Sequence, residues 1–111
     1  MRTLHYQFEA SRRPARPVHI GVVASGDLEI LLEPVNEDST SATHAQVRVR
    51  TSVDGFDHVW QATLQRFFAR TPVLGRWELN DAGATPAVVT LRLHQAADAA
   101  GTDATRTGDP A

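Results

Sequence analysis

The sequence predicts an α+β domain: a mainly antiparallel five-stranded sheet with two helices packed on one face. Two observations predict this fold class. Apolar and polar residues alternate in five short segments, and the spacing becomes helical in two longer ones. The order is four strands, a helix, a strand and a helix. With 111 residues and no cysteine, the chain must bury one core by packing alone, and we expect residues 1–100 to form that single domain.

The expected strands cover residues 3–9, 18–23, 27–33, 46–53 and 76–80. In the first of them, Leu4, Tyr6 and Phe8 alternate with polar residues, which is typical of a strand with one buried face. Between the first two strands, residues 10–17 hold two prolines and three arginines, which predict a solvated loop. After Pro34 stops the third strand, residues 36–41 are all polar and predict a second loop.

The first helix is expected from Phe56 to Arg70. Its apolar residues recur at intervals of three and four, so they gather on one face, which we expect to be core. Asp54 is the expected N-cap, and Asp57 lies close enough to the first turn to interact favourably with the helix dipole.

A second helix is expected to begin after Thr85, a capping residue followed by Pro86 at the first helical position, and to run to about residue 100. A strand over residues 88–93 stays open, because Val89, Leu91 and Leu93 also alternate with polar residues. Residues 101–111 have no apolar anchor and predict a disordered tail.

Charge and apolar runs exclude several classes of protein. All eleven basic residues are arginine, and they are scattered and outnumbered by thirteen acids, so we expect no nucleic-acid partner. The longest apolar runs are too short to span a bilayer, and the first residues lack the apolar core of a signal peptide. We therefore expect no membrane role and a cytoplasmic location.

Ser25 is the most unusual candidate residue. Ala24, Ser25 and Gly26 lie between two apolar strands, which predicts a tight antiparallel hairpin with the serine hydroxyl at its tip. One interpretation is covalent modification: Gly26 leaves the hydroxyl open, and Asp27 can orient it or assist the metal-dependent transfer of a phosphate group. The other is ordinary turn chemistry, which accounts for all three residues and is favoured on the residues alone.

Other chemistry is less well supported. A serine hydrolase needs a base, but the Gly-x-Ser-x-Gly motif is absent and a hairpin tip has no strand-to-helix elbow. No two histidines have the spacing of metal ligands, so surface positions are expected for them. The histidines are His5, His19, His44, His58 and His94. The glycine-containing turn from Asp81 to Pro86 precedes a helix and could hold an anion, but helix capping explains it better.

Three segments carry a resemblance to a known family. Residues 21–34, GVVASGDLEILLEP, are similar to the sequence around the modified serine of malonate decarboxylase acyl carrier subunits (delta subunits). Residues 81–93, DAGATPAVVTLRL, resemble the C-terminal signature of that family, and residues 51–55, TSVDG, resemble its strand-to-helix junction. The resemblance covers about residues 1–97. The acyl carrier subunit of citrate lyase is similar over a shorter element.

The resemblance implies a carrier that is not itself a catalyst. Ser25 would be joined by a phosphodiester to 2′-(5″-phosphoribosyl)-3′-dephospho-CoA, with Gly26 and Asp27 supporting the turn and no metal. The thiol of this arm would carry acetyl and malonyl groups, which agrees with a chain that has no cysteine. The implied partners are an acyltransferase subunit, decarboxylase subunits and the transferase that attaches the arm. A citrate lyase-like carrier and a non-covalent scaffold subunit are the alternatives.

Two features depart from the family pattern, the arginine-rich residues 11–17 and the longer loop of residues 35–44, and both are expected to be local insertions that affect partner contacts. Exposed arginines are candidates for contacting the phosphates of the arm or an acidic partner, although solvation is their ordinary role. These candidates are Arg48, Arg50, Arg66 and Arg70.

Overall fold

The sheet and helices occur in the order expected from the sequence. The computed structural model describes residues 1–35 and 42–101, so the polar loop at 36–41 and the tail from 102 lie outside the described residues. The elements are β1 (Arg2–Glu9), β2 (Val18–Gly21), β3 (Leu28–Glu33), β4 (His44–Thr51), α1 (Asp57–Arg70), β5 (Arg76–Asp81) and α2 (Pro86–Ala100). The predicted α+β class is confirmed.

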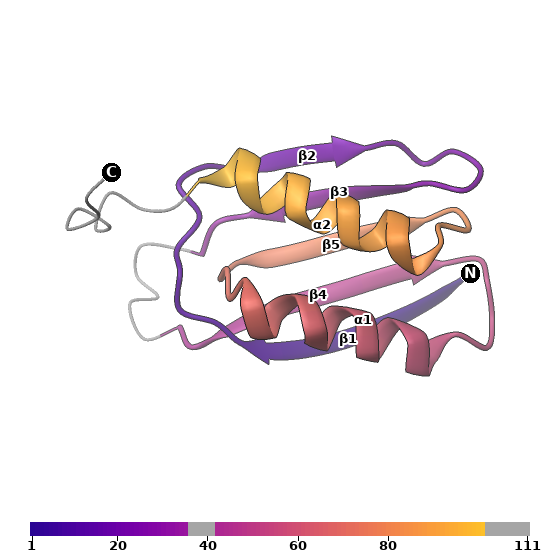
Figure 1. Cartoon of the computed structure of the whole chain (residues 1–111), viewed down its shortest axis with the longest axis horizontal. Coiled ribbons are helices and arrows are strands. Elements are labelled where there is room, and N and C mark those ends of the chain that lie inside the picture. Colours follow the sequence, from indigo (N-terminus) through magenta and orange to yellow (C-terminus); the bar gives the residue numbers. More distant parts are fainter. Residues whose placement is uncertain (36–41, 102–111) are drawn as a thin grey trace.

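The five strands form one sheet in the order β1-β4-β5-β3-β2. Within it β1–β4, β3–β5 and β2–β3 pair antiparallel, and the central pair β4–β5 is parallel, joined through α1. Both helices lie on the same face of this sheet (Figure 1). Helix α1 packs on β1, α2 packs on β2 and β3, and the two helices contact each other. The connections β2–β3, β4–α1 and β5–α2 gather at one end of the sheet, on the right in Figure 1.

Alternating side chains of the strands form the floor of the core. One row of paired residues crosses all five strands under the helices: Leu4, Val49, Leu79, Ile30 and Ile20. The three in the middle of the row are fully buried. From above, α1 contributes Leu64, Phe67 and Phe68, and α2 contributes Val89, Leu93 and Ala96. The two-residue period predicted this floor correctly, because only one face of the sheet is covered.

The start of α2 is settled by its cap. The hydroxyl of Thr85 accepts a hydrogen bond from the backbone N–H of Val88, and Pro86 occupies the first turn. The cap and the proline both favour helical backbone. Residues 88–93 lie inside α2, so the competing strand is wrong.

The predicted N-cap of α1 is wrong as well. The N-cap is Phe56, which makes no side-chain cap hydrogen bond. Asp54 lies two residues earlier, and Gly55 follows it with a φ of +85°, so the chain turns once more before the helix begins. Asp57 does lie in the first turn, as expected.

Residues 10–17 form a loop that is largely exposed, as their composition predicts, but the loop is also tied to a distant segment. The backbone N–H of Leu74 donates to the carbonyl of Arg12 at 2.7 Å, and the N–H groups of Ser11 and Arg12 both donate to Pro72. Pro14 is buried. This segment forms a parallel bridge, Arg12 with Val73, at the far end of the sheet from the β2–β3 connection.

Candidate functional site

Ser25 lies at an exposed turn in the connection between β2 and β3. The turn closes through a hydrogen bond of 2.9 Å from the N–H of Asp27 to the carbonyl of Ala24. Gly26 occupies its third position with a φ of +79°, a conformation that glycine adopts without strain. The hairpin is confirmed, but its connection is six residues long, from 22 to 27, because β2 ends at Gly21 and not at Val23.

Asp27 is held by an arginine from the helix above it. Arg92 of α2 donates from Nε to Oδ1 at 2.9 Å and from Nη2 to Oδ2 at 2.7 Å. Oδ1 also accepts the backbone N–H of Leu28 at 2.7 Å. These hydrogen bonds, above all those from Arg92, hold the pKa of Asp27 below its ordinary value. Such a bidentate pair fixes both the distance and the orientation of the carboxylate.

The backbone of the turn is tied to a second element. The N–H of Gly26 donates to the carbonyl of Ala82 at 2.8 Å, and the N–H of Ala82 donates to the carbonyl of Asp27 at 3.0 Å. Ala82 lies in the connection from β5 to α2. The turn is thus anchored by backbone bonds on one side and by Arg92 on the other, while the side chain of Ser25 stays exposed.

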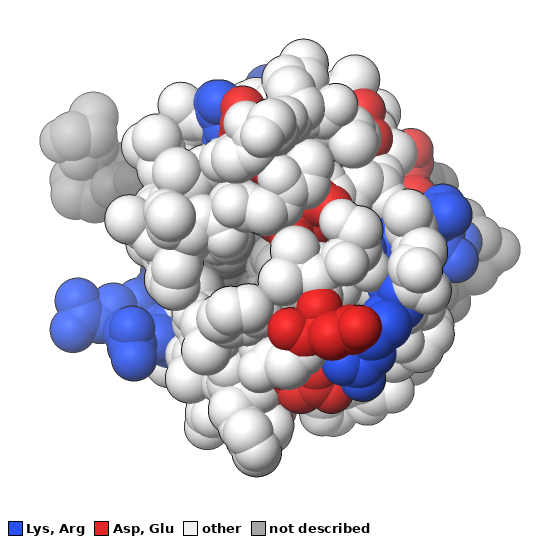
Figure 2. All heavy atoms as spheres, turned by 90° about the vertical axis from the view of Figure 1, so that its right-hand side faces the viewer, with Lys and Arg blue, Asp and Glu red and all other residues white. Residues whose placement is uncertain are grey.

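A pocket of about 400 Å³ opens beside this turn, between the beginnings of the two helices. Its walls are mostly apolar: Val53, Phe56, Val59, Trp60, Thr63, Asp81, Gly83, Ala84, Thr85, Pro86 and Val89. Figure 2 views the end of the molecule where the connections gather, and a hollow opens in its largely uncharged surface.

The pocket corrects the prediction that the whole apolar stripe of α1 is core. Phe56 is 49% exposed and Val59 is 40% exposed. Both line the pocket. Trp60 and the later residues of the stripe are buried as expected. In the sequence, only the position of Phe56 and Val59 at the beginning of the stripe indicated that they could be exposed.

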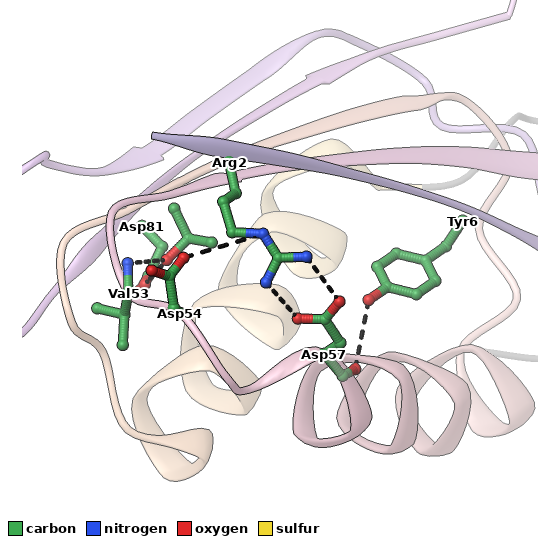
Figure 3. A network of polar contacts seen from close by, with 7 residues as sticks. Arg2, Tyr6, Val53, Asp54, Asp57 and Asp81 are labelled. Atoms are coloured by element: carbon green, nitrogen blue, oxygen red, sulfur yellow. Dashed lines mark hydrogen bonds and ion pairs between the residues drawn. The ribbon is translucent and has the colours of Figure 1, made fainter.

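A polar network supports one side of the pocket (Figure 3). Buried Asp81 accepts a hydrogen bond of 2.9 Å from the hydroxyl of Thr51, which in turn accepts the N–H of Val53. Nearby, the guanidinium of Arg2 donates to both carboxylate oxygens of Asp57 at 2.8 and 2.9 Å, and these bonds lower the pKa of Asp57. The junction from β4 to α1 is therefore held by Asp81 at its first end, through Thr51, and by Arg2 at its second end, through Asp57.

Two backbone donors at the turn from Asp81 to Pro86 already bond to side chains of the turn. The N–H of Ala84 donates to Asp81 at 2.9 Å, and the N–H of Val88 donates to Thr85. A buried carboxylate also repels an anion at this place. Helix capping, the interpretation favoured from the sequence, accounts for the segment.

The histidines give no support to a hydrolase. His19 binds Glu29 at 2.8 Å, His44 binds Thr43, and the ring of His94 packs edge-on against Phe67. In residues 1–35 and 42–101, no group of three potential metal ligands comes together. Over the same ranges, neither helix is long and apolar enough to cross a membrane.

The four candidate arginines are scattered. Arg48 pairs with Glu78, and both project from the sheet face away from the helices. Arg50 is exposed on the same strand. Arg66 and Arg70 are exposed in the second half of α1, which points away from the Ser25 end of the sheet. Arg92, which sequence reasoning did not single out, is the arginine that contacts the Ser25 turn.

Comparison with known proteins identifies the family. The family model of the malonate decarboxylase delta subunit (MdcD) matches residues 15–100. The chain belongs to the malonate decarboxylase delta subunit family. The malonate decarboxylase acyl carrier protein of Stenotrophomonas maltophilia strain K279a is 49% identical over 102 residues, covering 88% of this chain and 92% of that protein. The corresponding protein of Burkholderia cepacia is 48% identical over 98 residues, covering 85% of each chain.

A solved structure agrees with this family assignment. A chain in the crystal structure of a Pseudomonas malonate decarboxylase hetero-tetramer in complex with malonate superposes with a TM-score of 0.81 at 38% identity. The match covers 91% of this chain and all of that one. The shared fold therefore extends over most of this chain.

Proposed function

We propose that this chain is the acyl carrier subunit of a malonate decarboxylase and that Ser25 is the attachment point of its arm, 2′-(5″-phosphoribosyl)-3′-dephospho-CoA. The observation that carries the proposal is an exposed hydroxyl on a turn that Arg92 and Ala82 hold rigid. Family membership supports the carrier role, since the relatives are named acyl carrier proteins.

The residues around Ser25 suit a covalent arm. The space beside the turn is open, because a Cβ placed on Gly26 would meet no atom within 4 Å. A partner enzyme can therefore approach the hydroxyl. When bound, the arm supplies the thiol that carries acetyl and malonyl groups as thioesters. The chain itself has no cysteine to compete with that thiol.

In the attachment reaction, Ser25 acts as the nucleophile. Its proton would pass to a base, its Oγ would bond to the phosphorus of an activated form of the arm, and the P–O bond from that phosphorus to a phosphate or diphosphate leaving group would break. Asp27 is poorly suited to take the proton, because Arg92 binds both of its carboxylate oxygens and lowers its pKa. We therefore assign Asp27 to positioning the turn and expect the attaching transferase to supply the base.

The partners follow from the carrier role. An acyltransferase subunit would exchange acetyl for malonyl on the arm, and decarboxylase subunits would release carbon dioxide and regenerate the acetyl thioester. The related Pseudomonas chain is part of a malonate decarboxylase hetero-tetramer. We expect the chain to act in the cytoplasm together with the other subunits of the complex.

The intact mass of the protein tests the proposal. Material from cells that hold the whole pathway should be heavier than its sequence by one arm, with the added mass on Ser25. Ser25→Ala should lack the arm and abolish malonate decarboxylation while the complex still assembles. Ser11→Ala, at another exposed serine, is the matched control and should keep both. An unmodified Ser25 in that material, or normal turnover in Ser25→Ala, would refute the assignment.

The same experiment separates the alternatives. A non-covalent scaffold predicts that Ser25→Ala leaves turnover unchanged. A citrate lyase-like carrier predicts that the modified chain co-purifies with citrate lyase subunits instead of malonate decarboxylase subunits. A hydrolase predicts esterase activity in the purified chain that Ser25→Ala removes.

A further inference from the structure

The apolar pocket and the Ser25 turn are neighbours. Gly83 lines the pocket, and a Cβ placed on Gly83 would lie 3.9 Å from the backbone nitrogen of Gly26. The connection that holds Gly83 also makes the two backbone hydrogen bonds between Ala82 and the turn. A group attached to Ser25 therefore begins next to the rim of the pocket.

The lining selects against charge. None of the described lining residues is arginine, lysine or histidine, and the only ionisable one is Asp81. Asp81 is 8% exposed and accepts hydrogen bonds from Thr51 and from the N–H of Ala84. An anion would lose its hydration here and meet a carboxylate, so phosphates and a malonyl carboxylate are excluded from the pocket. An uncharged, flat or apolar group fits it.

We propose that this pocket binds the adenine ring of the arm attached to Ser25. The inference rests on the proposed function, because it concerns that arm. Adenine is uncharged and flat, and Phe56 and Trp60 give the pocket aromatic side chains on which a base can stack. A carboxylate has about four acceptor positions, so Asp81 keeps capacity to accept a bond from the amino group of adenine.

Position along the arm favours adenine over the pantetheine end. The base is bonded to the ribose that carries the phosphoribosyl link to Ser25, so only two sugars and a phosphate separate it from the protein. Pantetheine lies beyond the diphosphate, which the pocket excludes. A short flexible tether gives an effective concentration of the order of millimolar. Even a free ligand with a dissociation constant of about 1 mM would therefore occupy the pocket substantially once tethered.

Binding in the pocket would divide the arm into a fixed and a mobile part. The nucleoside would rest on the carrier, and the diphosphate and pantetheine would extend from the rim toward the partner active sites. Val59 of α1, which lines the pocket and is 40% exposed, would lie against the bound ring.

The first experiment uses the unmodified chain and free adenosine. In two-dimensional NMR spectra, adenosine should shift the amide signals of Val53, Ala84 and Val89, which line the pocket from the β4–α1 connection, the β5–α2 connection and α2. Val59→Glu should weaken this binding at least about fivefold, since it adds a charge at the mouth. Leu91→Glu is the matched control: it adds the same charge at a site 53% exposed on α2 and outside the pocket, and it should leave binding unchanged.

The second experiment compares the modified and unmodified chains, using the intact mass to verify the arm. Modification should shift the same three amide signals, and Val59→Glu should remove that shift while the mass on Ser25 persists. A missing mass would contradict the proposed function. A modified chain with unchanged pocket signals would overturn the adenine inference alone.

Two further results would overturn it. One is the absence of shifts in the native chain at adenosine concentrations about tenfold above the effective concentration of the tether. The other is a set of pocket shifts produced by pantetheine and not by adenosine. Both are measured on the native chain, so they decide the question even if Val59→Glu does not fold.

Discussion

Two glycines on either side of Ser25 have almost the same φ but different surroundings. Gly21 ends β2 with a φ of +77°, and Gly26 follows Ser25 with a φ of +79°. A Cβ on Gly21 would overlap the carbonyl oxygen of Leu28, whereas one on Gly26 would meet nothing within 4 Å. Replacing each by alanine therefore separates the cost of the conformation from the cost of the clash.

The magnitudes follow from these two terms. A left-handed conformation costs an L-residue about 1–2 kcal/mol, so Gly26→Ala should destabilise the chain by that amount. Gly21→Ala has the same conformational cost and adds an overpacking term of about 1–3 kcal/mol, because Leu28 is a backbone neighbour in the β2–β3 ladder. The entropy that alanine removes from the unfolded chain is similar for both variants and cancels in the comparison.

Urea unfolding followed by tryptophan fluorescence measures both free energies of unfolding. We expect Gly21→Ala to be the less stable variant by about 1–3 kcal/mol, with unfolding slopes like that of the native chain. Equal losses in the two variants would refute the reasoning, because they would mean that the carbonyl of Leu28 moves aside without cost. A larger loss in Gly26→Ala would refute it as well.

Three further predictions concern the core and the anchor of the Ser25 turn. Leu93→Ala should lower the free energy of unfolding by about 2–5 kcal/mol in the same assay, because Leu93 is fully buried between α2 and the sheet. Arg92→Met should speed hydrogen exchange at the N–H of Gly26, because it releases Asp27. Unchanged exchange would show that the backbone bonds to Ala82 hold the turn without Arg92. Arg92 lowers the pKa of Asp27 in the folded chain, so this stabilisation is full above the unfolded pKa of about 3.9 and is lost as pH falls through the lower folded pKa. The urea midpoint should therefore fall steeply below about pH 4, and less steeply in Asp27→Asn, whereas parallel curves would contradict the role of the pair.

The strands could be predicted from the sequence because each has one covered face. Leu28, Ile30 and Leu32 repeat every second residue, and this period is local information. The parallel pairing of β4 with β5 is not local, since it depends on which strands meet after the chain passes through α1. The ties of residues 10–17 could not be predicted for a similar reason, because their backbone partners Pro72, Leu74 and Ala100 are distant in sequence.

The position of the Ser25 turn could be predicted, but its anchor could not. Asp27 and Arg92 are 65 residues apart, and each alone looks like an ordinary surface charge. The pocket escaped prediction because Phe56 and Val59 have the same helical spacing as the core residues that follow them. Periodicity gives the direction of a side chain but not whether a neighbouring element covers it.

The order of the strands has a consequence for synthesis in the cell. The pairs β1–β4 and β2–β3 consist of strands that are synthesised before β5. The two pairs do not contact each other directly in the sheet. They are joined only by β5, which is inserted between β4 and β3. Until the ribosome has released residues 76–81, the nascent chain therefore exposes two inner strand edges that have no partner. Translation that stops before this point would yield a fragment prone to aggregation and proteolysis, although it already contains Ser25.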